Sequence, residues 1–138
     1  MPVFDTTHNI RKIIEAINAL MGMPIPFFQR FKQGGIGSRR MVIEELSEGL
    51  LPYVNARHYL TYSNIERRPK GIMVHIHKTL DNFAWCILYE NVELSFLENG
   101  QVKLEAEGEF ILFRDGYKFN KKYFDQLQAI CSAHQQKN

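Results

Sequence analysis

The sequence has 138 residues, of which 45% are hydrophobic, 12% aromatic and 23% charged. This length favours one globular domain, and the composition excludes a disordered chain, a collagen-like repeat and a disulfide-rich miniprotein. The formal net charge of +2 is too small for a dedicated nucleic-acid-binding domain, so we expect no nucleic-acid partner. No apolar run approaches the roughly 20 residues of a membrane-spanning helix.

The cysteines and the N-terminal residues indicate the compartment. Cys86 and Cys131 are the only cysteines, and their spacing is neither that of a redox pair nor that of a zinc knuckle. Arg11, Lys12 and Glu15 interrupt the segment where a signal peptide would need its apolar core. We therefore expect a cytoplasmic protein with reduced thiols.

The N-terminal part has the periodicity of an amphipathic helix that ends at Gly22. Its apolar positions are Ile10, Ile13, Ile14, Ile17, Leu20 and Met21. This face needs a partner surface, either in the rest of the chain or in a second copy, which would make a homodimer. Three glycines within residues 33–40 then predict a linker, so we divide the chain into a helical extension (1–38) and a main unit (39–138).

The middle of the chain predicts an antiparallel sheet. Apolar and polar residues alternate, as in Ile72, Val74 and Ile76 against Met73, His75 and His77, which indicates one packed face and one wet face. The intervals between strands are too short for crossover helices, and Asn99-Gly100 is a strong hairpin signal. The predicted strands are Met41–Leu46, Arg57–Ile65, Ile72–Lys78, Phe83–Tyr89, Val92–Leu97, Val102–Glu107 and Glu109–Arg114.

An amphipathic helix is predicted after the last strand. Its apolar stripe consists of Tyr123, Phe124, Leu127, Ile130 and Cys131, and Asn120 is a suitable N-cap. The predicted fold class is therefore α+β, with an antiparallel, partly closed barrel of about seven strands, a packed C-terminal helix and an N-terminal helical extension.

This order of elements from Met41 to His134 resembles the pleckstrin-homology-like barrel. In that family two bent antiparallel sheets close imperfectly, and a terminal helix fills one open corner. The sequence departs from the family pattern in its N-terminal extension and in Trp85, which lies in a predicted middle strand instead of the terminal helix. The resemblance implies a binding or scaffolding module, with lipid head groups or peptides as common partners.

Two clusters are candidates for binding. Arg67, Arg68 and Lys70 lie in the turn between the second and third predicted strands, where cations can converge on an anionic head group; the alternative is a solvated hairpin turn. Phe27, Phe28, Arg30 and Phe31 mix aromatic and basic residues. This second cluster would contact a membrane surface or a partner, or would pack the N-terminal part onto the barrel.

Three histidines indicate an alternative kind of site, one that binds a metal ion. His75 and His77 share one face of a predicted strand, and His58 lies on the strand before it. Together they could bind zinc with an open position for water, as in a small metal-dependent enzyme. The competing interpretation places them on the sheet surface without a metal.

No catalytic pattern is otherwise present in the sequence. Neither cysteine has a neighbouring base, and no Gly-x-Ser-x-Gly motif occurs. We therefore expect a non-catalytic binding or assembly module without a cofactor, which recognises an anionic head group or a protein partner. The alternatives are the metal-dependent enzyme and a small-ligand carrier with a cavity inside the barrel.

Overall fold

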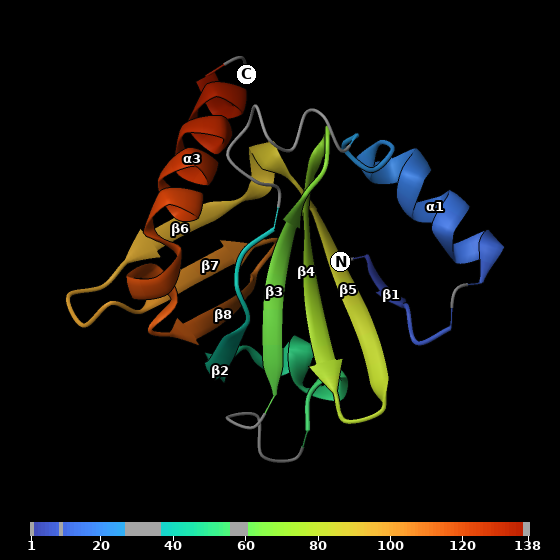
Figure 1. The fold of residues 1–138 in the computed structure, drawn as a ribbon, viewed down its shortest axis with the longest axis horizontal. Coiled ribbons are helices and arrows are strands. Elements are labelled where there is room, and N and C mark those ends of the chain that lie inside the picture. The colour runs from blue at the N-terminus through green and yellow to red at the C-terminus, as the bar shows by residue number, and fades with distance from the viewer. Residues whose placement is uncertain (1, 9, 27–36, 56–60, 137–138) are drawn as a thin grey trace.

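The computed structural model describes residues 2–8, 10–26, 37–55 and 61–136 (Figure 1). Its strands are β1 (Val3–Asp5), β2 (Met41–Leu46), β3 (Tyr62–Arg67), β4 (Gly71–Lys78), β5 (Asp81–Leu88), β6 (Glu93–Phe96), β7 (Val102–Ala106) and β8 (Glu109–Arg114). The helices are α1 (Arg11–Met21) and α3 (Gly116–Gln136), and there are short 3-10 helices, η1 (Glu48–Tyr53) and η3 (Tyr89–Asn91).

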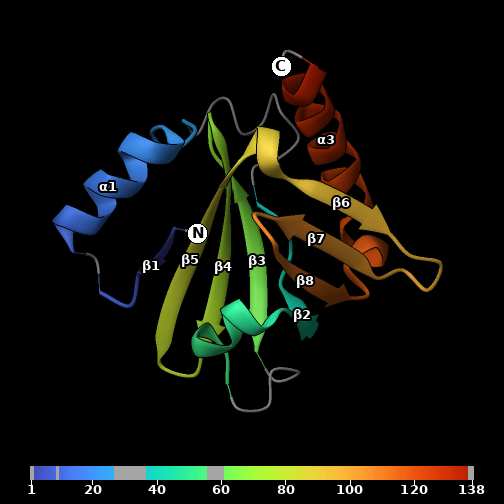
Figure 2. The ribbon, with the colours of Figure 1, turned by 180° about the vertical axis from the view of Figure 1, so that it is seen from behind.

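All eight of these strands form one antiparallel sheet in the order β1-β5-β4-β3-β2-β8-β7-β6. β2 pairs with β3 at Met41 and Val42, and with β8 from Val42 to Leu46. The register shifts between Ile43 and Glu45, and the sheet changes direction at β2 (Figures 1 and 2). Such irregularities bend a strand, so one sheet provides two halves that face a common core.

The predicted α+β class, the antiparallel sheet and the C-terminal helix are confirmed. The sheet is open, because β1 and β6 stand at opposite ends of the strand order. A closed barrel with an internal carrier cavity is therefore not the architecture of the described residues.

The main core lies between the two halves of the sheet. β4 contributes Ile72, Val74 and Ile76, and β5 contributes Trp85 and Ile87, all fully buried. α3 packs into the same core through Tyr123, Phe124, Leu127 and Cys131. In addition, the Tyr123 hydroxyl donates to the Ile65 carbonyl oxygen at 3.1 Å, which ties α3 to β3.

A second, smaller core lies on the other face of β4 and β5. Ile17 and Met21 of α1 pack there against Met73, Ala84 and Cys86. The apolar face of the predicted N-terminal helix is therefore partly covered by this chain's own sheet. Our expectation that the face carrying Met73 is wet was wrong at this residue, which is only 3% exposed beneath α1.

The ends of several elements differ from the predictions. β1 was not predicted, because three residues are too few to show alternation. α3 begins at Gly116 instead of after Asn120, whose backbone is non-helical (φ −131°, ψ 27°) between two helical parts. The first part of the predicted linker and the beginning of the strand predicted from Arg57 lie outside the described residues.

Among the residues described, none of the helices combines the length and the apolar composition that crossing a bilayer requires.

Gly71 provides a test of how closely β4 and β5 pack. A Cβ atom at this position would lie 2.0 Å from the carbonyl oxygen of Ile87, which belongs to the backbone and cannot turn away. We expect Gly71→Ala to lower the free energy of unfolding by about 3 kcal/mol, at the upper end of overpacking costs. Chemical denaturation measures this loss.

Gly100→Ala is the matched control for this substitution. Gly100 has a φ of +84° and no atom within 4 Å of a built Cβ, so its cost is confined to the backbone, about 1–2 kcal/mol. An equal or smaller loss for Gly71→Ala than for Gly100→Ala would contradict the described approach of the two strands.

Candidate functional site

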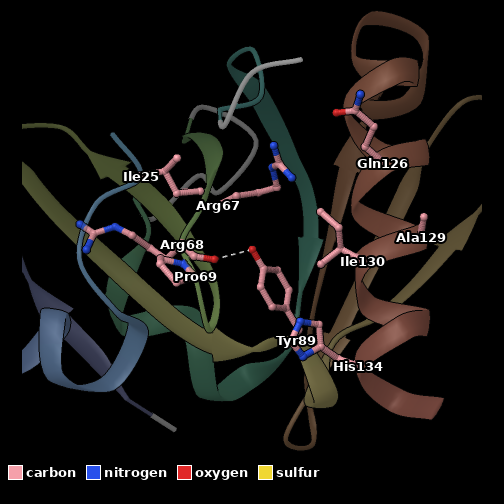
Figure 3. Close-up of a pocket in the computed structure, with 9 residues that line it drawn as sticks. All are labelled: Ile25, Arg67, Arg68, Pro69, Tyr89, Gln126, Ala129, Ile130 and His134. Atoms are coloured by element: carbon pink, nitrogen blue, oxygen red, sulfur yellow. Dashed lines mark hydrogen bonds between the residues drawn. The ribbon is translucent and has the colours of Figure 1, made fainter. Parts of the chain in front are cut away.

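A pocket of about 560 Å³ lies between the β3–β4 turn, η3 and α3 (Figure 3). Its wall combines apolar and polar side chains from distant parts of the sequence. The lining residues are Ile25, Arg67, Arg68, Pro69, Tyr89, Gln126, Ala129, Ile130 and His134.

Arg67 enters this pocket because β3 continues to that residue. Alternation along β3 places Ile65 and Arg67 on the face of the main core and Glu66 on the opposite face. Arg67 is only 4% exposed, and its guanidinium group points toward α3 and Gln126 (Figure 3). A guanidinium group is charged at all physiological pH values, so the pocket carries a permanent positive charge in its wall.

Tyr89 forms the floor of the pocket beside this charge. Its hydroxyl donates to the carbonyl oxygen of Arg68 at 2.5 Å. Burial raises the pKa of Tyr89 to about 12, although the charge of Arg67 acts in the opposite direction. Tyr89 therefore remains a neutral hydrogen-bond donor near neutral pH, and it fixes the β3–β4 turn against η3.

α3 supplies the third wall. His134 lies against the Tyr89 ring, with 4.9 Å between the ring centroids. The side-chain oxygen of Gln126 is buried and accepts no hydrogen bond from the part of the chain that the structure describes. Gln126, Ile130 and His134 recur at four-residue intervals and so share one side of α3, with Ile130 as the apolar contact between the two polar groups.

The side chain of Arg68 points in the direction opposite to that of Arg67 (Figure 3). It donates to Glu66 Oε2 at 2.7 Å, and to Asn18 Oδ1 and the Gly22 carbonyl oxygen, both at 2.9 Å. Arg68 therefore attaches the end of α1 to the sheet. The charged groups of Arg67 and Arg68, which we expected to converge with Lys70 on one anion, point apart, and Lys70 is exposed.

The predicted strand histidines have separate partners. His75 Nε2 lies 2.9 Å from Glu66 Oε1. His77 Nδ1 lies 2.9 Å from Asn82 Oδ1, and its Nε2 lies 2.7 Å from Asn64 Oδ1. Within residues 2–8, 10–26, 37–55 and 61–136, no three histidine, cysteine or acidic side chains are grouped so that they could hold a metal ion.

Two of our predicted sites extend beyond these residues. His58 lies outside the described residues, so the three-histidine metal site stays a prediction. Phe27, Phe28, Arg30 and Phe31 lie outside them as well, and their contact with a membrane or partner also stays a prediction.

Sequence analysis missed Tyr89, Gln126 and His134 as pocket residues. The spacing of Gln126, Ile130 and His134 along one helix face was a signal that could have identified the α3 wall. Nothing local in the sequence connects this face with Tyr89 or Arg67, because the three walls meet only in the folded chain.

Glu66 provides a pH-dependent test of the attachment of α1. Burial raises the pKa of Glu66, but the hydrogen bonds with His75 and Arg68 outweigh burial and hold this pKa below its usual value. The stabilisation is then fully present above the unfolded pKa of roughly 4.3, and is lost as the pH falls through the lower folded pKa.

We expect Glu66→Gln to lower the free energy of unfolding at pH 7 by about 1.5–3 kcal/mol, the range for hydrogen bonds to charged groups. The difference from the wild type should shrink as the pH falls below about 4.3, where the unfolded wild-type chain takes up the proton, and should disappear once the pH is below the lowered folded pKa of Glu66. Denaturation at a series of pH values measures both effects. A difference that is constant across the acid range would contradict the role of the Glu66 charge.

Comparison with known proteins gives no assignment. No protein-family model matches the sequence, and no curated protein or solved structure gives a significant match. A function for this chain must therefore be inferred from the arrangement of its own side chains.

Proposed function

We propose that this chain is a non-catalytic binding module whose pocket beside α3 takes a ligand with an anionic group joined to an apolar portion. The observation that carries the proposal is Arg67, a cationic side chain that is 4% exposed and lines a pocket of about 560 Å³. A carboxylate or phosphate in the pocket would add two parallel hydrogen bonds from the guanidinium fork.

The other walls support an amphipathic ligand. Ile25, Pro69, Ala129 and Ile130 provide apolar surface, while Gln126 and His134 provide hydrogen-bonding groups. The volume falls within the roughly 300–1,000 Å³ of typical small-molecule sites, which combine an apolar lining with a few polar groups. The anionic group would lie at Arg67, and the apolar portion would lie along Ile130 and Pro69.

The chemistry of the cysteines supports binding over covalent catalysis. Burial raises the pKa of Cys86 and of Cys131 to about 12, so both are neutral thiols near neutral pH. A thiol in this state is a poor nucleophile. Tyr89 is also neutral, and its hydroxyl is committed to the Arg68 carbonyl oxygen.

We propose in addition that the fold is an open variant of the pleckstrin-homology-like barrel, which agrees with a binding role. Three features support this proposal: the hairpin order from β2 to β8, the pairing of β2 with both β3 and β8, and the packing of α3 against the core. In this interpretation β1 and α1 are additions at one edge of the sheet.

Octyl phosphate and octanoate are suitable probes below their micelle concentrations, and octyl glucoside is the uncharged comparison. We expect isothermal titration to detect the two anions and to give weaker binding or none for the glucoside. Arg67→Gln should weaken octyl phosphate binding about tenfold or more, because each charge-assisted hydrogen bond contributes about 1.5–3 kcal/mol.

Lys70→Gln is the matched control, because it removes the same charge from an exposed residue of the adjacent turn. It should leave the affinity nearly unchanged. Thermal denaturation shows whether Arg67→Gln folds. If it does not, Arg67→Lys is tested in its place, since lysine keeps the charge but lacks the two parallel N–H donors of the guanidinium group. Equal affinity of the wild type and Arg67→Lys for octyl phosphate, or no binding by the wild type, would refute the proposal.

A further inference from the structure

A second pocket, on another part of the surface, has a strongly basic wall. It has a volume of about 290 Å³ and is lined by Gly37, Arg39, Phe119, Asn120, Lys121, Lys122 and Tyr123. Lys118 is adjacent, with its ammonium group 5.4 Å from the centroid of the Phe119 ring. We call Arg39, Lys118, Phe119, Lys121 and Lys122 the basic surface.

The buried side-chain amide of Asn120 joins the two segments that form the basic surface. Asn120 is 5% exposed, and its Oδ1 accepts a hydrogen bond from the backbone N–H of Arg39 at 2.7 Å. Its Nδ2 donates to the Gly116 carbonyl oxygen at 3.1 Å. The segment that leads into β2 is therefore fastened to the beginning of α3, and Arg39 lines the same pocket as Lys121 and Lys122 of α3.

Within the described residues, the four cations of the basic surface are not held in ion pairs. Arg39, Lys118, Lys121 and Lys122 are exposed and make no ion pair with an acidic side chain in the part of the chain that the structure describes. Elsewhere the chain does pair its cations with carboxylates, as in Arg11–Glu15, Arg68–Glu66, Lys103–Glu105 and Arg114–Glu44. The positive charge of the basic surface is therefore available to an external anionic partner.

The exposed ring of Phe119 indicates which kind of anionic partner the basic surface binds. Phe119 is 57% exposed and lines the same pocket as Arg39, Lys121 and Lys122. Aromatic rings that lie among cations are favourable at the boundary between lipid head groups and acyl chains, where the ring enters the apolar layer and the cations meet phosphates. A nucleic acid would instead favour a series of stacking rings along a groove, whereas the basic surface contains a single exposed ring.

From this combination we infer that the basic surface docks on an anionic lipid bilayer. Phe119 enters the interface, and Arg39, Lys121 and Lys122 contact the lipid phosphates. This contact is independent of the pocket that contains Arg67. It uses the beginning of α3, whereas the Arg67 pocket uses Gln126, Ile130 and His134 farther along the helix.

Vesicle sedimentation tests the inference with the full chain. We expect binding to vesicles of phosphatidylcholine mixed with phosphatidylserine, weaker binding at high NaCl concentration, and no binding to phosphatidylcholine alone. Lys121→Glu combined with Lys122→Glu should lower partitioning at least about 30-fold, since each cation near an anionic bilayer strengthens binding roughly fivefold and the two new carboxylates are repelled by the anionic lipids. Phe119→Ser should also lower partitioning, but the remaining binding should keep the wild-type salt dependence.

Arg11→Glu combined with Lys12→Glu is the matched control. It changes the net charge by the same amount at two adjacent exposed helix residues, and α1 lies across the molecule from α3 (Figure 1). This variant should keep at least about half of the wild-type binding, since distant charges are screened beyond about 8 Å. Circular dichroism confirms that each variant is folded.

Three results would overturn the inference. The first is no binding of the wild type to vesicles that contain phosphatidylserine. The second is an equal loss in the α1 control, which would indicate a response to net charge without a defined surface. The third is displacement of the protein from the vesicles by single-stranded oligonucleotides or by inorganic phosphate, at concentrations comparable to that of the lipid. This result would assign the cations to another ligand.

Discussion

The pairing of β2 on both of its edges is the constraint on which the arrangement of this protein depends. β3 lies on one side of this strand and β8 on the other, and the shift between Ile43 and Glu45 lets the sheet turn there. Two halves of one sheet can then enclose a common core without a closed cylinder. One side of that core remains for a helix to cover, and α3 fills it with Phe124 and Leu127.

The placement of α3 determines both surfaces that we connect with binding. Along its middle and last turns, the helix faces the end of β3 across the pocket that contains Arg67. At its beginning, the non-helical backbone of Asn120 lets a side chain reach back and hold the segment before β2. The same helix therefore closes the core, shapes an inward pocket and presents cations outward.

The sequence predicted the middle strands well, because alternation and turn residues are local signals. It did not predict the pocket, because the positions of Arg67 and Arg68 relative to the strand end were predicted wrongly. The second predicted strand ended at Ile65, which placed Arg67 and Arg68 together in a turn, whereas β3 continues to Arg67. The pleat then sends the two neighbouring guanidinium groups to opposite faces. Tyr89 and His134 could not be added from sequence, because only tertiary packing brings η3 and α3 together.

The two cysteines lie in different packed layers of the molecule. Cys86 belongs to the layer beneath α1, and Cys131 belongs to the layer between α3 and the sheet. An alkylating reagent can reach each sulfur atom only when its own layer separates, because brief local openings differ in free energy across a fold. The two modification rates, resolved by mass spectrometry of peptides, would therefore report the undocking of each helix separately, with no probe introduced into the chain.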